Sequence, residues 1–158
     1  MDLPTLRGLL RYEPESGDFY WLGAKKGLAA GAKAGTLCNG YVRIGIDKRI
    51  YAAHALAWLW VYGKLPSALD HIDGCRSNNR IGNMRECSQA QNLQNQRRAR
   101  SDSTSGLLGV SWRKQVGKWR ACITVAGHHK ELGHYGTKDE AYAAYVAAKR
   151  QLHEFNTI

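Results

Sequence analysis

The chain has 158 residues, enough for one ordinary core or two small ones and too few for a large multidomain enzyme. Its 23 Lys and Arg residues outnumber its 13 Asp and Glu residues, and the formal charge is +10. The excess is shared, because residues 1–98 carry 14 basic and 8 acidic residues and residues 99–158 carry 9 and 5. Such a chain is drawn to polyanions, although a high positive charge can also simply keep a protein soluble.

The cysteines and the apolar runs exclude two further classes of protein. The four cysteines lie far apart and form no C-x-x-C pair, so we expect free thiols and no structural zinc. No stretch approaches the roughly 20 apolar residues that a membrane span needs, and the first residues lack the basic and apolar runs of a secretory signal. We therefore expect a cytoplasmic, intracellular protein with no membrane partner.

Apolar spacing and turn signals predict the elements of the N-terminal part. Leu3, Leu6, Leu9 and Leu10 recur at helical spacing and predict a short helix over 3–12. The elements expected after it are a turn over 13–17, a strand over 19–22, a loop over 23–35, a hairpin over 42–51 and a buried helix over 54–62. The lysines of the loop could contact phosphate, although a solvated loop is the simpler interpretation.

The middle of the chain predicts the order strand, loop, strand and helix. A strand over 70–71 is followed by a connection that begins at Asp73 and by a second strand over 83–87. Ser88 and Gln91 then form a capping-box pattern that opens a helix. The two strands are close enough in sequence to pair as a hairpin.

Residues 99–106 are small, polar and free of periodicity, which is the composition of a flexible linker. The elements expected beyond it are strands over 109–114, 118–125 and 130–135 and a helix opened by the capping box of Thr137 and Glu140. These strands predict a three-stranded antiparallel sheet packed on one helix. The chain as a whole therefore predicts an α+β protein with domains over 1–98 and 107–158.

The segment from Asp70 to Cys87, which reads DHIDGCRSNNRIGNMREC, closely resembles the core of phage- and intron-associated HNH homing endonucleases. The match is specific because several unlike residues agree at fixed spacing. Its further positions are Gly40-Tyr41, His54, Trp58 and Asn92. The resemblance covers almost all of the first domain, and it implies a ββα-metal (HNH) nuclease fold in a protein encoded by a bacterium or a phage.

The resemblance also implies a role for each residue of the motif. His71 would act as the base, and Asp70 and Asn92, which lie 22 positions apart, would hold one Mg²⁺ or Mn²⁺ ion. Asn83 would pin the hairpin loop through side-chain hydrogen bonds to the backbone. His54 is expected to be a packed histidine with a satisfied ring nitrogen, placed where it can also support the site.

The chemistry of these residues fits hydrolysis of a phosphodiester, which needs a base for water and a cation for the charge on the phosphate and the departing oxygen. An ordinary imidazole pKa of about 6.5 makes His71 a workable base, and oxygen ligands suit Mg²⁺ or Mn²⁺ better than zinc. Adjacent residues of a regular strand point to opposite faces, so Asp70 and His71 require a bend or a cation at the strand edge. Outside such a pattern, an Asp-His pair is usually an ordinary exposed or salt-bridged dipeptide.

A second set of residues marks the C-terminal domain. It comprises Gly109-Val110, Gly117-Lys118-Trp119, Leu132-Gly133, Tyr135, Glu140-Ala141 and Ala144-Tyr145. The set resembles the plant ethylene-response-factor (APETALA) DNA-binding domain, which is also found beside HNH nucleases in phages. Ser111 and Thr124 stand where the plant domains usually carry arginines, so no target sequence is predicted.

Strand alternation leaves Lys118 and Arg120 on the open face of the predicted sheet, joined by Arg113 from the first strand. A basic sheet face can enter a major groove, although one face of such a sheet must meet water in any case. Contacts with DNA are assigned to Arg97, Arg98, Arg113, Lys114, Lys118 and Arg120.

The sequence supports one leading hypothesis for the function and leaves two others open. The leading one is a metal-dependent DNA endonuclease that reaches double-stranded DNA through its C-terminal domain. The second is a non-catalytic DNA-binding protein or regulator derived from such a nuclease. The third, a protein that binds or cuts RNA, shares the positive charge but lacks a recognisable RNA module.

Overall fold

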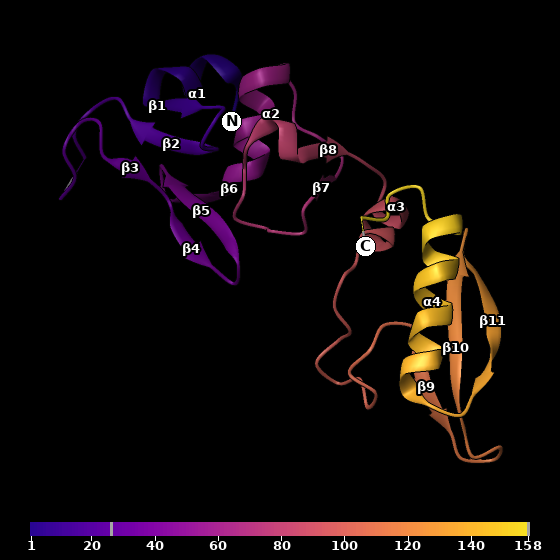
Figure 1. Ribbon diagram of the computed structural model, residues 1–158. Helices are drawn as coiled ribbons and strands as arrows, with labels where there is room; N and C mark the ends of the chain where they lie inside the picture. Colours follow the sequence, from indigo (N-terminus) through magenta and orange to yellow (C-terminus); the bar gives the residue numbers. More distant parts are fainter. Residues whose placement is uncertain (26, 158) are drawn as a thin grey trace. The chain divides into compact units, whose positions relative to one another are not determined.

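The computed structural model describes residues 1–25 and 27–157 (Figure 1). The chain forms two compact units, Met1–Ser88 and Gln89–Ile158, which are described separately below. Helices and small antiparallel sheets occur in both, and this confirms the α+β class. Within the described residues, no helix combines the length and the apolar character that crossing a membrane requires.

The first unit is built from three small sheets and two α-helices. Its elements are α1 (Leu3–Leu9), β1 (Leu10–Glu13), β2 (Asp18–Trp21), β3 (Lys33–Ala34), β4 (Thr36–Cys38), β5 (Tyr41–Ile46), β6 (Arg49–Ala52), α2 (Ala53–Tyr62), β7 (Leu69–His71), the 3-10 turn η1 (Ile81–Asn83) and β8 (Met84–Glu86). The sheets have the orders β1-β2-β3, β4-β5-β6 and β7-β8, and all their pairs are antiparallel.

The N-terminal helix is shorter than the sequence predicts. The Asp2 side chain caps α1 by accepting from the Thr5 N–H at 2.8 Å, and the helix ends at Leu9. Residues 10–12, which were assigned to the helix, instead belong to β1 (Leu10–Glu13), which pairs with β2. Leu10 and Tyr12 are buried on alternate positions of this strand, so a period of two replaces the helical period where the chain meets β2.

The core of the first unit surrounds α2. Leu56, Ala57 and Leu59 of this helix are buried, and the helix packs against α1, β5 and β6. Gly63 ends the helix in the left-handed conformation. The first residues of α2 follow β6 directly, and this places His54 at the start of the helix, next to His71 of β7.

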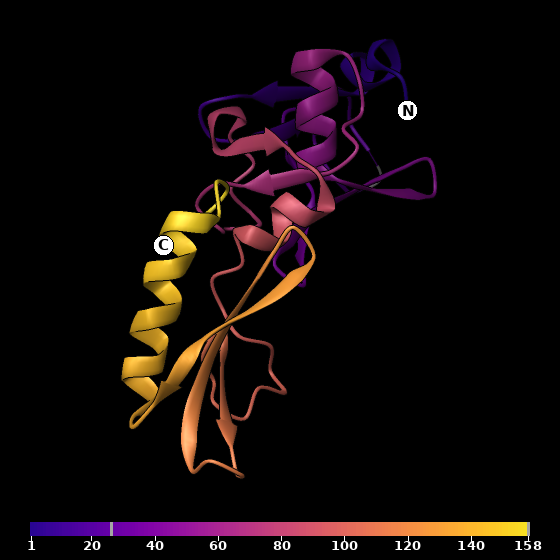
Figure 2. The same cartoon turned by 90° about the vertical axis from the view of Figure 1, so that its right-hand side faces the viewer.

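The second unit consists of a short helix and a three-stranded sheet covered by one long helix (Figures 1 and 2). Its elements are α3 (Gln89–Gln94), β9 (Val110–Arg113), β10 (Lys118–Val125), β11 (His128–Tyr135) and α4 (Lys138–Leu152). The sheet order is β11-β10-β9, and the capping box of Thr137 and Glu140 opens α4 as predicted. The core is small, with Val110, Ala121 and Ala141 at its centre.

The division between the units falls after Ser88, whereas the sequence predicts a boundary after residue 98. The reason is a set of contacts from the end of the chain to the residues after α3. The buried Lys149 ammonium donates to the Gln96 carbonyl, and burial, followed by the charge of Arg97, lowers the pKa of this lysine to about 8. Arg97 Nη2 donates to Thr157 Oγ1 at 2.5 Å. Because of these bonds, the residues that follow α3 belong with the C-terminal unit.

The predicted linker over 99–106 is also more ordered than its composition suggests. Ser105 is buried, and its hydroxyl donates to the carbonyl oxygens of Val110 at 2.7 Å and Leu107 at 3.1 Å. The same oxygen accepts from the Leu107 N–H at 3.2 Å. Ser105, near the end of this segment, is therefore hydrogen-bonded to the first residue of β9.

Candidate active site

The strand β7 carries the Asp-His pair at its end. Both side chains are buried, with exposed fractions of 4% for Asp70 and 7% for His71. Asp70 lies opposite Arg85 of β8, and Oδ2 of its carboxylate accepts from Arg85 Nε at 2.9 Å and from Nη2 at 2.7 Å. The guanidinium thus compensates the charge of a carboxylate that would be costly to bury alone. Arg85 was not predicted as this partner, although the register of the hairpin places it opposite Asp70.

His71 is oriented by a buried asparagine of the connecting loop. Its Nε2 lies 3.3 Å from Oδ1 of Asn79, which is only 2% exposed. An amide oxygen can only accept, so this bond places the proton on Nε2 and the lone pair of the neutral ring on Nδ1. Burial lowers the pKa of His71, more than the nearby Asn79, Asp73 and Asp70 raise it. The imidazole is therefore neutral at neutral pH, the form that a base requires.

A second histidine and a tyrosine stand beside His71. The His54 ring lies 5.3 Å from the His71 ring, nearly perpendicular to it, and the Tyr41 ring lies 5.5 Å from His54 and 6.4 Å from His71. Burial, with smaller effects of His71 and Arg43, lowers the pKa of His54 to about 4. The expectation of a satisfied ring nitrogen is wrong for Nδ1, which is buried and has no hydrogen-bond partner within the described residues.

The loop between β7 and β8 is held by a network of asparagine and aspartate side chains. Asn83 donates from Nδ2 to the Asn78 carbonyl at 2.9 Å and to Asp73 Oδ1 at 3.0 Å, and its Oδ1 accepts from the Asp73 N–H at 3.1 Å. Asn78 Nδ2 donates to Asp73 Oδ2 at 2.7 Å. Burial opposes ionisation of Asp73, but hydrogen bonds from Asn78, the Cys75 N–H and Asn83 hold its pKa below the ordinary value.

The β1-β2-β3 sheet also contacts the loop between β7 and β8. The Tyr12 hydroxyl donates to the Asn79 carbonyl at 2.7 Å, and burial raises the pKa of this tyrosine to about 12. Gly17, in the turn between β1 and β2, has φ +79°, and a Cβ there would lie 2.4 Å from the Arg80 nitrogen. Neither contact was predicted from the sequence, because Tyr12 was expected in a helix and Asn79 lies 67 positions further along the chain.

Asn92, the other predicted metal ligand, lies on α3 and belongs to the second unit. Its pairing with Asp70 around one cation therefore stays a prediction. The described residues contain no cluster of three or more His, Cys, Asp or Glu side chains that could hold a metal, and all four cysteines are free thiols. A carboxylate and an amide oxygen are nevertheless the donor types that Mg²⁺ and Mn²⁺ accept.

The predicted DNA contacts of the second unit lie on and near one face of its sheet. Arg113 pairs with Lys118, and Ser111 pairs with Arg120, so these side chains share a face. Ala121, the next residue of β10, is fully buried with the helix core, which places Arg120 on the opposite face. Arg120 lies 4.0 Å from Glu131, and its Nε is buried without a partner among the described residues.

The remaining predicted contacts lie outside the sheet. Lys114 is exposed in the turn after β9. Arg98 follows Arg97, whose guanidinium is bonded to Thr157 as described above. The structure therefore gathers Arg113, Lys118 and Arg120 on one surface.

Residues 51–94 match the protein family described as HNH endonuclease. The match includes His54, Asp70, His71, Asn83 and Asn92. The chain is also 32% identical over 113 residues to Protein 3.8 of Escherichia phage T7, an alignment that covers 67% of this chain and 90% of that protein. No solved structure matches the chain. The family match ends before the C-terminal sheet, so the likeness of that sheet to an APETALA-type domain stays a prediction.

Proposed function

The chain belongs to the family of Protein 3.8 of Escherichia phage T7 and contains an HNH endonuclease domain, and from this premise we propose that it is a metal-dependent endonuclease of double-stranded DNA. The observation that carries the proposal is the state of His71. Its ring is buried, neutral and bonded through Nε2 to Asn79, next to the carboxylate of Asp70. A base of this kind is what hydrolysis of a phosphodiester requires.

In the proposed reaction, His71 Nδ1 accepts a proton from the water that attacks phosphorus. The new bond joins the water oxygen to phosphorus, and the bond from phosphorus to the departing deoxyribose oxygen breaks. Asp70 and Asn92 would hold Mg²⁺ or Mn²⁺, whose charge, when the ion is bound, stabilises the phosphate and the departing oxygen. Asn79 fixes the tautomer of the base, and Asn83 supports the loop that carries Asn79.

The other residues singled out in the sequence take supporting and binding roles in this proposal. His54 supports the site as a neutral imidazole packed against His71. The sheet of the second unit binds duplex DNA through Arg113, Lys114, Lys118 and Arg120, with Arg97 and Arg98 contacting phosphate nearby. Arginine suits guanine edges and phosphate, whereas lysine acts on phosphate as a point charge.

The test is cleavage of duplex DNA by the full chain with Mg²⁺ or Mn²⁺, compared with excess chelator. His71→Ala should reduce cleavage by about 10²- to 10⁴-fold, the usual contribution of a general base, while DNA binding is retained. His128→Ala is the matched control, because this histidine is exposed at the start of β11. Cleavage by His71→Ala at the normal rate would exclude the assignment. Binding by the wild type without metal-dependent cleavage would favour the non-catalytic DNA-binding protein.

A further inference from the structure

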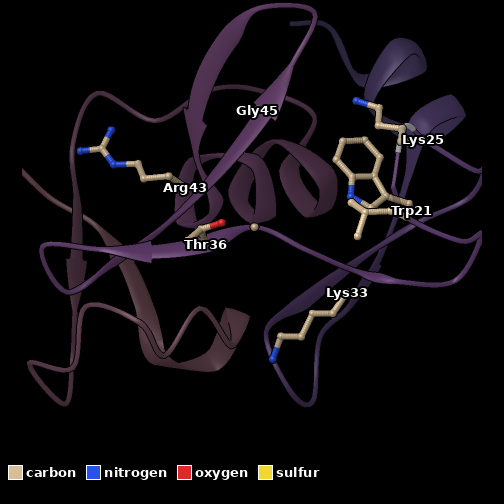
Figure 3. Close-up of a pocket in the computed structure, with 8 residues that line it drawn as sticks. Trp21, Lys25, Lys33, Thr36, Arg43 and Gly45 are labelled. Atoms are coloured by element: carbon tan, nitrogen blue, oxygen red, sulfur yellow. The ribbon is translucent and has the colours of Figure 1, made fainter.

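A surface hollow of the first unit, about 440 Å³ in volume, lies among β2, β4, β5 and the loop after β2 (Figure 3). Trp21, Thr36 and Arg43 line it from the strands, and Lys25 lines it from the loop. The described lining includes three cationic side chains and no carboxylate. A hollow of this composition attracts an anion.

The cations of the hollow differ in how far their charge is compensated. The Lys33 ammonium lies 2.6 Å from the Asp18 carboxylate, so its charge is largely satisfied within the protein. The Lys25 ammonium lies 3.7 Å from the centre of the Trp21 ring. Within the described residues, neither Lys25 nor Arg43 has an acidic partner. Lys25 and Arg43 therefore supply the positive charge that a ligand would meet.

Arg43 connects this hollow with the candidate active site. Its guanidinium points away from Trp21 and Lys25 in Figure 3 and lies 5.9 Å from the centre of the Tyr41 ring. Arg76 lies over the same ring at 5.1 Å. The Tyr41 ring in turn lies 6.4 Å from that of His71. Positive charge thus continues from the hollow to the imidazole of the base, within one compact unit.

We propose that this surface, formed by Lys25, Arg43, Tyr41 and Arg76 and here called the basic track, binds the phosphate backbone of the DNA strand beside the bond that is cut. The inference rests on the proposed function and names the path of the substrate. Guanidinium groups held against an aromatic ring present their N–H donors to phosphate at little entropic cost. The Trp21 ring is 5% exposed and covered by Lys25, so it anchors a cation and is closed to a stacking base.

Binding by the basic track should consequently depend on salt and be indifferent to sequence. Each phosphate contact made on B-DNA contributes a slope of about −0.9 to the dependence of log affinity on log salt concentration. This behaviour differs from that of the sheet in the second unit, where arginines are proposed to reach base edges. The two surfaces can therefore be told apart by the same binding measurement on duplexes of different sequence.

The experiment measures duplex binding over a range of salt concentrations, without metal, in full-length protein that carries His71→Ala. Adding Arg43→Gln should weaken binding to every sequence and reduce the salt slope by about 0.9. Arg49→Gln is the matched control, because it removes the same charge from the neighbouring strand β6, outside the hollow. Arg43→Lys should recover part of the affinity, and Lys33→Gln should have the smallest effect because of Asp18.

Equal affinities and equal salt slopes for Arg43→Gln and Arg49→Gln would overturn the basic track, provided that thermal unfolding shows both variants to be folded. The assay contains neither the base nor a metal, so its outcome does not depend on cleavage. A wild type that fails to cut DNA, with the Arg43 effect intact, would remove the nuclease proposal and leave the track. In a cutting wild type, Arg43→Gln should raise KM more than it lowers kcat.

Discussion

The active-site loop of the first unit and the sheet of the second unit carry their polar side chains in opposite ways. In the loop, Asp73 and Asn83 are hydrogen-bonded to each other and to Asn78, and Asn79 is bonded to His71. On the sheet, the side chains of Arg113 and Lys118 are exposed and have no hydrogen bond or ion pair within the described residues. Proton transfer needs one orientation of the base, whereas attraction to phosphate tolerates mobile cations.

The difference extends to the packing beneath each surface. The loop rests on a core in which Leu6, Leu10, Phe19 and Ile44 are at most 1% exposed. The sheet rests on a smaller core centred on Val110, Ala121 and Ala141, against which larger side chains are only partly buried, and the helix that covers it buries a lysine. A large core can hold a catalytic loop within a few tenths of an ångström, which a binding face does not require. The loop should therefore be the more sensitive of the two regions to small changes.

The largest effect is expected at Gly17, where the first sheet meets the loop. Gly17→Ala would place a Cβ 2.4 Å from the Arg80 nitrogen and 2.5 Å from the Asn79 carbonyl carbon, in a left-handed backbone. Backbone atoms cannot yield as a flexible side chain can, so we expect a loss of roughly 3 kcal/mol in the free energy of unfolding. Urea denaturation measures it.

Gly31→Ala is the matched control for this prediction. Gly31 has nearly the same φ, +81°, but a Cβ there would meet no atom within 4 Å. It should cost only the left-handed strain, about 1 kcal/mol. If both substitutions destabilise the protein equally, the contact between the turn and the loop contributes nothing.

The next effect concerns catalysis and depends on Asn79. Asn79→Ala removes the acceptor that holds the proton on His71 Nε2, so the lone pair is no longer fixed on Nδ1. We expect kcat for DNA cleavage to fall about 10- to 100-fold, the range found for side chains that orient a catalytic group. Single-turnover cleavage with saturating DNA measures this step.

Asn78→Ala is the comparison for Asn79, because both side chains belong to the loop and only Asn79 reaches the base. Asn78 binds Asp73 instead, so its loss should lower stability more than kcat. Lys118→Gln on the sheet should change KM and leave kcat unaltered. A kcat that falls equally in both loop variants would show that the loop as a whole, and not the bond to His71, sets the rate.

The local elements of both regions could be predicted from the sequence, because hairpins, caps and the motif depend on residues close together in the chain. The helix over 54–62 and the capping box of Thr137 are examples. The end of α1 could not, because the strand character of Leu10 and Tyr12 arises only from pairing with β2. The hydrogen bond from Tyr12 to Asn79 joins residues 67 positions apart, and no local sequence pattern predicts it.

The unit boundary and the partners of charged groups were missed for the same physical reason. Lys149 falls within a helix whose apolar stripe is readable, but its burial depends on a carbonyl of Gln96, 53 positions earlier. Arg85 follows from the hairpin register once the two strands are paired, and so a more careful pairing of β7 and β8 could have found it. Periodicity shows which face of an element is buried, but it does not identify the residues that pack against that face.

The smallest effect separates the histidines of the two regions by pH. The pKa of His54 is about 4 in the folded chain and 6.5 for an ordinary histidine, and that of His71 is also lowered. Below pH 6.5 the unfolded chain therefore binds protons that the folded chain does not bind. The free energy of unfolding should fall as the pH drops from about 6.5 towards 4.

His54→Gln should make this decline less steep, because it removes the imidazole whose pKa is about 4 while His71 continues to contribute. His128→Gln is the control, since this histidine is exposed at the start of β11 in the second unit. Urea denaturation at intervals between pH 4 and 7 gives the slopes. An identical decline in wild type and His54→Gln would mean that this histidine is protonated as easily in the folded chain as in the unfolded one, and the site would then lack the buried, neutral imidazole pair that distinguishes it from the sheet.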